Sequence, residues 1–406
     1  MRVELRSGRK AHLTYCANVH AAESADDVIA VVKGPMRRVF GRLAGLAAPT
    51  PLAAGLRFSA AAAFAFRDDA FLVEELGDAL LAADAHALTV NAFVYGDFHG
   101  KPVKRAVYRP DWTTDERVAF TVATAEVLAA LPALASTQSI STSPGSFKAF
   151  GPANDLAMAE RFARVAAELH MLEMQFDRRI VLAVEPEPGC SFETIDEWIR
   201  FYEEVLLRGA WPALEKLKPG NRAAQETILR AHLTTCFDVC HAAVEFEDVA
   251  AAFRRLAARG IAVGKIQLSN ALRLGAVAPG SSVLERLRDF SDAVYLHQTV
   301  AKDDAGGLHA FEDLPDFLAA AERRPFAAAR VHFHVPLFFD GRDGLLSTTP
   351  DLALALESIA DLPDESHLEI ETYTWNVLPA KERSISIEDG IVAEYAWARA
   401  RIAERT

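Results

Sequence analysis

The sequence predicts a (β/α)₈ barrel, and two patterns support this fold class. Short apolar runs alternate with longer segments of helical period along the chain of 406 residues, as in strand-helix units around a parallel sheet. In addition, residues with metal-ligand chemistry follow several of the late apolar runs. Such residues are expected at the carboxyl ends of barrel strands, because the loops that follow the strands form the active site of this fold.

Eight apolar runs are the predicted barrel strands. They cover residues 12–20, 55–60, 87–95, 139–145, 179–188, 233–241, 263–270 and 368–375. Two further strand-like runs, 293–300 and 329–338, make the order of strands in the final third of the chain ambiguous. Either one of them is the seventh barrel strand, or they form a hairpin or an extra layer beside the barrel.

The chain is longer than a simple barrel, which typically needs about 250 residues. Insertions are therefore expected around residues 100–135, 190–232 and 274–330. The sequence shows neither an internal repeat nor a linker long enough to separate domains. We expect residues 1–406 to form one elaborated barrel domain.

The composition is that of a soluble globular protein, with 51% hydrophobic and 24% charged residues and a formal net charge of −13. This acidic balance argues against nucleic acid as a partner and favours a small molecule. The four cysteines fit neither paired zinc-ligand spacing nor a disulfide framework, which favours a reducing compartment. We see no secretory signal or transmembrane segment and expect a cytoplasmic protein, whose oligomeric state the sequence does not indicate.

Four consecutive late strands end in side chains that can bind a cation. They are Glu185 in AVEPEP, Asp238 in FDVCH, Gln267 in KIQLSN and Glu371 in EIETY. Several acids in one barrel mouth are unfavourable unless a cation or a proton neutralises them. A site made mainly of oxygen ligands suits Mn²⁺, Mg²⁺ or Co²⁺, with some access to Zn²⁺. The sequence therefore predicts one divalent metal ion.

Each of these acids also has a simpler interpretation, as a solvated charge or a helix cap. Three other glutamates lie within a few residues of the chosen ligands, namely Glu187, Glu245 and Glu369. Period-two alternation places Glu369 on the same face as Glu371, but deeper in the strand.

Several segments together resemble a known family. VEPEPGC, FDVCHAAVEFED, GKIQLSNALR and HLEIETYTW, with HLTYCANVH, YGDFHG and SISTSPGSFK, are similar to the metabolite traffic protein EboE group, within the xylose isomerase-like barrel superfamily of sugar isomerases and epimerases. The similarity to the EboE group spans nearly the whole chain. The similarity to the wider superfamily is concentrated in the four late strands.

This resemblance implies a barrel with one divalent ion held by Glu185, Asp238, Gln267 and Glu371. It also implies that His241 and Arg273 contact the substrate. Sugar epimerases of the superfamily usually have histidine where Gln267 stands, whereas hydroxypyruvate isomerase-like members have glutamine. The segment of roughly a hundred residues between Gln267 and Glu371 is a departure from the superfamily pattern. It makes the run 368–375 a less certain choice for the eighth strand. The EboE group is associated with moving a metabolite precursor.

The predicted chemistry is proton transfer on a small sugar or α-hydroxy carbonyl compound. If Glu185 and Glu371 flank the substrate, one carboxylate removes the proton next to the polarised carbonyl, and an enediolate results. Return of the proton to the same carbon gives epimerisation, and delivery to the neighbouring carbon gives isomerisation. We predict Glu185, Glu371 and His241 as catalytic residues. Further substrate contacts are predicted at Asn18, His20 and His334.

The histidines support a rival prediction. His332 and His334 alternate in VHFHVP and so share a face, as two ligands on one strand would. Together with the acids and with His20 and His99, they could hold a zinc cluster for phosphoester hydrolysis, as in the barrel endonucleases of this superfamily. The role of His297 is left open.

A third class of function is a metabolite-binding protein without catalysis. Aromatic residues near the predicted mouth could line its pocket, because ligand sites are mainly apolar with a few placed polar groups. An isomerase or epimerase should exchange a substrate proton with solvent deuterium, whereas a binding protein should not.

Overall fold

The computed structural model describes residues 1–45, 51–342, 344–379, 382 and 385–403. Its main sheet has nine strands in the order β1-β2-β14-β8-β7-β6-β5-β4-β3. All pairs in this sheet are parallel except that of β1 (Arg2–Glu4) with β2. Its parallel strands are β2 (Lys10–Tyr15), β3 (Leu52–Arg57), β4 (Ala85–Asn91), β5 (Thr137–Thr142), β6 (Arg179–Val184), β7 (Leu233–Asp238), β8 (Val263–Leu268) and β14 (Ser366–Ile370).

A parallel bridge between Cys16, which follows β2, and Gly55 of β3 closes the sheet on itself. The chain is a (β/α)₈ barrel. Each of its eight parallel strands overlaps one of the eight predicted runs, so the sequence prediction of the fold is confirmed. The seventh barrel strand is β8, and neither of the two ambiguous runs takes that place.

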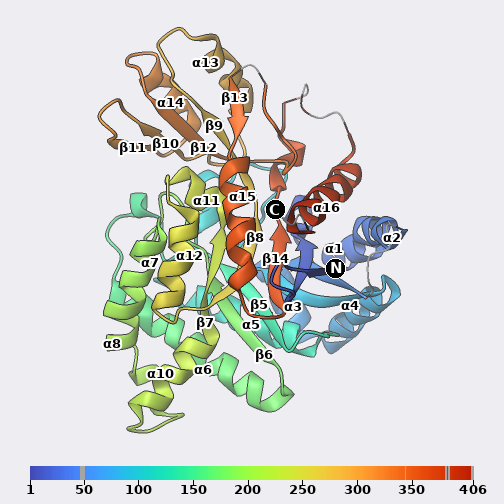
Figure 1. The fold of residues 1–406 in the computed structure, drawn as a ribbon. Helices are drawn as coiled ribbons and strands as arrows, with labels where there is room; N and C mark the ends of the chain where they lie inside the picture. Colours follow the sequence, from blue (N-terminus) through green and yellow to red (C-terminus); the bar gives the residue numbers. More distant parts are fainter. Residues whose placement is uncertain (46–50, 343, 380–381, 383–384, 404–406) are drawn as a thin grey trace.

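Helices surround the barrel (Figure 1). They are α1 (Ala25–Val31), α2 (Arg37–Gly45), α3 (Ala60–Asp68), α4 (Ala70–Ala82), α5 (Asp115–Ala130), α6 (Asp155–Phe176), α7 (Ile195–Phe201), α8 (Leu207–Gly209), α9 (Pro212–Glu215), α10 (Arg222–His232), α11 (Val239–Val244), α12 (Val249–Ala258), α15 (Thr349–Ser358) and α16 (Ile387–Ala403). Among the helices of the described residues, none combines the length and apolar character needed to cross a bilayer.

Helix α6 shows how the sequence builds this outer layer. The side chain of Asn154 accepts a hydrogen bond from the amide of Ala157, which satisfies one of the free donors at the start of the helix. Further along, Met158, Phe162 and Leu169 are buried. Their spacing places them on one face, which packs toward the barrel.

The chain between β8 and β14 forms a second sheet, of five antiparallel strands in the order β11-β10-β12-β9-β13. Figure 1 shows it, with two short helices, at one end of the barrel. These elements are β9 (Asn270–Leu274), α13 (Ser282–Leu287), β10 (Thr299–Lys302), β11 (Leu308–Phe311), α14 (Leu314–Ala321), β12 (Ala328–Val335) and β13 (Leu345–Ser347). The insertion predicted around 274–330 therefore lies in an extra sheet, which continues to residue 347.

The other two predicted insertions are smaller departures from the barrel pattern. The segment 100–135 contains a short 3₁₀ helix over Lys104–Tyr108 and then the ordinary barrel helix α5. The segment 190–232 holds four helices, α7 to α10, between β6 and β7. Most of the additional chain thus forms the five-stranded sheet between β8 and β14.

The barrel closes where β3 passes close to β2 and β14. A Cβ atom at Gly55 would lie 2.5 Å from the carbonyl oxygen of Tyr15 and would collide with the carboxylate of Glu369. We expect Gly55→Ala to lower the free energy of unfolding by about 1–3 kcal/mol, because the backbone must move to admit the methyl group. Urea denaturation tests this. Gly41→Ala in α2 is the control, since its Cβ meets nothing within 4 Å.

Candidate functional site

A cavity opens at the carboxyl ends of the barrel strands. Its polar lining consists of Asn18, Arg57, Asn91, Glu185, Glu187, His241, His332, His334 and Glu371. The rest is largely apolar and aromatic, and it includes Phe93, Val94, Phe98, Tyr108, Tyr295, Leu296 and Tyr373. An apolar and aromatic lining with a limited set of polar groups is typical of small-molecule sites.

The structure brings the four predicted metal ligands together. One carboxylate oxygen from each of Glu185, Asp238 and Glu371 lies within 4.8 Å of the others. The side-chain amide of Gln267 donates a hydrogen bond of 3.2 Å to Oε1 of Glu185. Because these residues come from β6, β7, β8 and β14, or directly follow them, the barrel itself positions the cluster.

Asp238 shows how the local sequence fixes a ligand. It is the last residue of β7, and its Oδ1 accepts the amide N–H of His241 (3.0 Å) at the start of α11. The hydroxyl of Ser269 also donates to Oδ1 (2.7 Å). The short spacing from the acid to the imidazole in FDVCH therefore builds a helix cap, which holds the carboxylate and leaves its second oxygen unused.

Three buried oxygens of this cluster face no hydrogen-bond donor in the described part of the chain. They are Oε2 of Glu185, Oδ2 of Asp238 and Oε1 of Gln267. A buried acceptor without a partner costs about 1–3 kcal/mol. A divalent cation bound by these oxygens removes that cost, and carboxylate and amide oxygens are the ligands that hard cations prefer. The residues present thus fit the predicted metal ion.

Burial dominates the electrostatics of the carboxylates. It raises the pKa of Glu185 to about 7 against the attraction of His241, and the negative charge of Asp238 adds to the rise. The pKa of Glu371 is raised well above its ordinary value by burial and by the charges of Glu185 and Asp238. By contrast, the pKa of Asp238 is lowered, because His241, His334 and the Ser269 hydroxyl outweigh its burial.

Two asparagines orient Glu371. Asn18 donates to its Oε1 at 2.8 Å, and Asn91 donates to the same oxygen at 3.2 Å. Asn18 was predicted as a substrate contact, and it does line the cavity. Asn91 was not singled out from the sequence, because it lies in the middle of the predicted run 87–95, whereas the observed strand β4 ends at this residue. Both amides hold one carboxylate oxygen and leave the other for a ligand.

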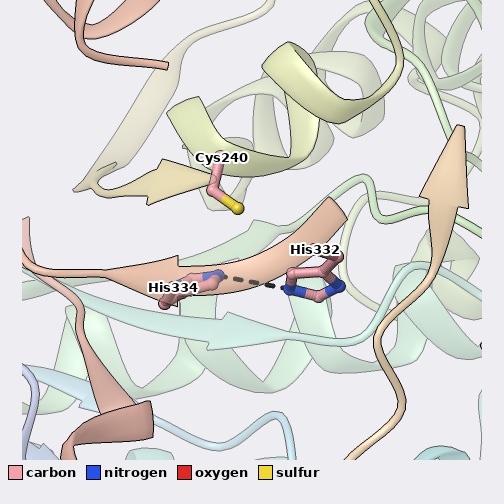
Figure 2. Close-up of side chains that lie close together, drawn as sticks. All are labelled: Cys240, His332 and His334. Atoms are coloured by element: carbon pink, nitrogen blue, oxygen red, sulfur yellow. Dashed lines mark hydrogen bonds between the residues drawn. The ribbon is translucent and has the colours of Figure 1, made fainter. Parts of the chain in front are cut away.

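Three histidines form a cluster beside the oxygens. His241 follows β7, while His332 and His334 lie on β12 of the inserted sheet. The Nε2 atoms of His241 and His332 are 3.1 Å apart, and those of His332 and His334 are 3.2 Å apart. Figure 2 shows His332 and His334 on their strand, with Cys240 of α11 directed toward them. The inserted sheet therefore adds two imidazoles to the cavity.

Two predicted substrate contacts lie outside the cavity lining. His20 is in contact with the hydroxyl of Tyr15 (3.1 Å). Arg273 lies on β9 opposite Arg330 of β12, two residues before His332 on that strand. Neither is among the residues that line the cavity in the described part of the chain. Their roles in substrate binding stay predictions.

The three competing glutamates have different surroundings. Glu187 lines the cavity, and its Oε1 accepts the hydroxyl of Tyr108 at 2.7 Å. Glu369 lies deeper in the barrel, as period-two alternation predicts, and forms a fully buried ion pair of 2.6 Å with Lys265. Glu245 directly follows α11 and is close to the acids Glu193, Glu197 and Glu247.

Burial raises the pKa of Glu245 to about 8, and the charges of Glu193, Glu247 and Glu197 add to the rise. The folded state therefore binds this proton more tightly than the unfolded state, and stability is lost as the pH rises from about 4.5 through 8. We expect Glu245→Gln to raise the free energy of unfolding by about 1–3 kcal/mol at pH 9, with little effect at pH 4.5.

Urea denaturation across this pH range measures the effect. The exposed Glu116 provides the control, because Glu116→Gln removes a carboxylate that is in contact with solvent and not buried. If Glu245→Gln raised the free energy of unfolding by the same amount at pH 4.5 and pH 9, the raised pKa of Glu245 would not be the cause.

The comparisons with known proteins concern the fold. No protein-family model matches the chain, and no curated protein matches it. Among solved structures, it is similar to the IolI protein, in a structure with a binding zinc atom, at 10% identity and a TM-score of 0.47, covering 96% of this chain and 97% of that one.

Two epimerase structures are similarly distant. The 3-keto-D-glucoside 4-epimerase YcjR from E. coli has 11% identity and a TM-score of 0.44, with 96% of this chain and 99% of that one covered. L-ribulose 3-epimerase has 11% identity and a TM-score of 0.42, with 97% and 99% covered.

Proposed function

We propose that this protein is a divalent-metal-dependent isomerase or epimerase that acts on a small sugar or another α-hydroxy carbonyl metabolite. The observation that carries the proposal is the pairing of Glu185 and Glu371. These carboxylates directly follow strands β6 and β14, which are not neighbours in the sheet. One oxygen of each lies within 4.8 Å of the other, beside oxygens that lack a hydrogen-bond donor.

A divalent cation held by Glu185, Asp238, Gln267 and Glu371 supplies Lewis acidity that polarises a carbonyl and acidifies the adjacent C–H bond. The protein supplies the proton acceptor and donor. Glu185 and Glu371 both line the cavity, so one carboxylate can take a proton from the substrate carbon and the other can return one.

The surrounding residues support the same chemistry. The donors Asn18 and Asn91 keep Glu371 oriented while it exchanges a proton. His241 lines the cavity next to Asp238 and can move a hydroxyl proton of the substrate or stabilise a developing oxyanion. The aromatic part of the lining excludes water from the reacting carbon.

Solvent deuterium exchange tests the reaction. The protein is loaded with Mn²⁺ and incubated in D₂O with a panel of ketoses, aldoses and α-hydroxy ketones, and NMR follows the loss of the C–H signal next to the carbonyl. We expect exchange that requires both protein and metal and that stops when a chelator is added. Protein that holds no divalent metal and catalyses no exchange contradicts the proposal.

The histidine cluster favours a second candidate, a zinc-dependent hydrolase of a small phosphoester. Its three imidazoles supply the nitrogen ligands that zinc prefers. Among the described residues, however, the one cationic side chain that lines the cavity is Arg57, which is bound to Glu23 and to the carbonyls of Ala22 and Gly96. The zinc ions alone would thus have to hold the phosphate, because the lining offers no further Lys or Arg side chain among the described residues. Release of nitrophenol from a nitrophenyl phosphodiester, without deuterium exchange, would select this candidate.

Binding without catalysis, as in metabolite traffic suggested by the EboE resemblance, is the third candidate. It predicts that a ligand binds and shifts the melting temperature, while neither deuterium exchange nor hydrolysis occurs. The same panel of compounds therefore separates all three functions.

A further inference from the structure

A second group of side chains with metal-ligand chemistry lies away from the cavity, near the starts of two barrel strands. His170 and Glu173 belong to the last part of α6, the helix before β6, and His232 is the last residue of α10, directly before β7. The cavity lies at the opposite, carboxyl ends of the strands. This group is therefore separate from the oxygen cluster and from the proposed reaction.

Helix packing brings the three side chains together. His170 and Glu173 are three residues apart on α6, so they are neighbours on the helix surface. Helix α10 packs against α6, and Figure 1 shows both at the end of the barrel away from the inserted sheet. One ligand atom from each of His170, Glu173 and His232 lies within 4.8 Å of the others. The group is thus compact enough to bind a single ion.

His232 presents an unprotonated nitrogen to this group. Its Nδ1 lies 2.8 Å from the carbonyl oxygen of Ile180, near the start of β6. A backbone carbonyl only accepts hydrogen bonds, so Nδ1 carries the proton, and Nε2 of the neutral ring is a free lone pair. The side chain is fully buried, and this burial lowers the pKa of His232, which favours the neutral ring.

The free nitrogen of His232 faces a carboxylate. Its Nε2 is 3.2 Å from Oε2 of Glu173, yet it is buried and has no hydrogen-bond partner in the described part of the chain. Both atoms are acceptors when the ring is neutral, so their approach is unfavourable unless a positive charge lies between them. Oε1 of Glu173 is already held by Arg179, whose Nε and Nη2 lie 2.9 and 2.8 Å from it. Oε2 is the oxygen left for a cation.

The spacing and the supporting contacts suit a zinc ion. Zinc binds imidazole nitrogen at about 2.0–2.1 Å and carboxylate oxygen at about 2.0–2.2 Å, so two such ligands in a tetrahedral site are about 3.3–3.5 Å apart. The 3.2 Å between His232 and Glu173 is close to this spacing. In metal sites, a ligating imidazole usually donates its other N–H to a carbonyl, and ligating carboxylates are themselves hydrogen-bonded. Ile180 and Arg179 supply these two contacts.

We propose that His170, Glu173 and His232 bind a zinc ion that links α6 to α10, and we call this position the helix site. Two imidazoles and one carboxylate favour zinc over magnesium or calcium, which prefer oxygen ligands. His170 and Glu173 are half-buried, so a water molecule can take the fourth position. The amino-terminal rim of a barrel contributes to stability and not to catalysis. The ion therefore stabilises the packing of the two helices that precede β6 and β7.

Thermal unfolding with added Zn²⁺ tests the helix site in solution. Glu185→Gln is the background, because it removes an oxygen ligand of the cluster at the barrel mouth. In this background, Zn²⁺ at 100-fold above its dissociation constant is expected to raise the melting temperature by about 3 °C. Adding His170→Ala should abolish this rise and remove one equivalent of bound zinc.

A matched control and a measurement without variants accompany this experiment. His309 of β11 pairs with Asp303 in the inserted sheet, so adding His309→Ala to the same background should keep both the rise in melting temperature and the equivalent of zinc. Crystals of the wild-type chain soaked with Zn²⁺ show the ion directly by anomalous scattering at the zinc edge. We expect a peak between α6 and α10, in contact with His232 and Glu173.

Two results would overturn the helix site. One is a zinc-dependent rise in melting temperature, with its equivalent of zinc, that His170→Ala leaves unchanged. The other is an anomalous map without a peak between α6 and α10, which would mean that a proton and not a metal lies between His232 and Glu173. Neither result bears on the oxygen cluster, whose test is deuterium exchange with Mn²⁺. Failure of the helix site and failure of the proposed function can therefore be told apart.

Discussion

Glu185→Gln is expected to reduce proton exchange by about 10²–10⁴-fold, because the amide cannot accept the substrate proton. The same substitution weakens the metal site, since Oε2 of Glu185 is one of the unsatisfied oxygens. Deuterium exchange at saturating Mn²⁺ separates these effects. If the Glu185→Gln protein then binds its full complement of metal but still does not exchange the substrate proton, Glu185 acts in proton transfer. We expect Glu371→Gln to behave in the same way, because Glu371 supplies the opposite carboxylate.

Glu245→Gln is the matched control for this experiment, because Glu245 is also a carboxyl group with a raised pKa but does not line the cavity. Its exchange rate should equal that of the parent. If the Glu185→Gln protein exchanged deuterium as fast as the parent, the proposed isomerase chemistry would be wrong, even if the metal site itself were correct.

Lys265→Met is expected to lower the free energy of unfolding by about 3–5 kcal/mol, because it leaves the carboxylate of Glu369 charged and unpaired inside the barrel. Both side chains are fully buried, with Nζ and Oε2 2.6 Å apart, and Nζ also donates to Ser141 at 3.1 Å. The expected loss is a large fraction of the stability of a typical domain. Guanidinium denaturation measures it.

The partner residue provides the test of mechanism. Combining Lys265→Met with Glu369→Gln removes both charges and should recover most of the lost stability. Arg38→Met is the comparison on the surface, where the guanidinium pairs with Glu388 and is largely exposed, so little change is expected. If the double variant were as unstable as Lys265→Met alone, lost packing rather than an unpaired charge would be the cause.

The ligand positions could be found from the sequence because they depend on strand ends. A parallel barrel brings the carboxyl ends of all its strands to one rim, so Glu185, Asp238, Gln267 and Glu371 are close together once their strands are identified. The same alternation correctly separated Glu369, which faces the barrel interior one layer deeper. The positions of these residues follow from hydrophobic period and barrel topology.

The histidine cluster could be anticipated only in part. The alternation in VHFHVP indicated that His332 and His334 share a face, but not that β12 belongs to an inserted sheet or that this face reaches His241. The sequence also gave no means of excluding Arg273 and His20 from the cavity lining, because their distance from it depends on how the inserted sheet and the first barrel loop are placed.

The sequence by itself determined the barrel, its eight strands and the acids at their ends. The hydrophobic period identifies each strand and helix from local sequence, and their alternation predicts a parallel barrel whose strands all end at one rim. Only the tertiary structure decided which groups meet there. The two asparagines on Glu371, the ion pair beneath it and the three facing imidazoles join residues that are far apart in the chain. Such contacts arise from strand register and from the placement of the inserted sheet, which local patterns do not specify.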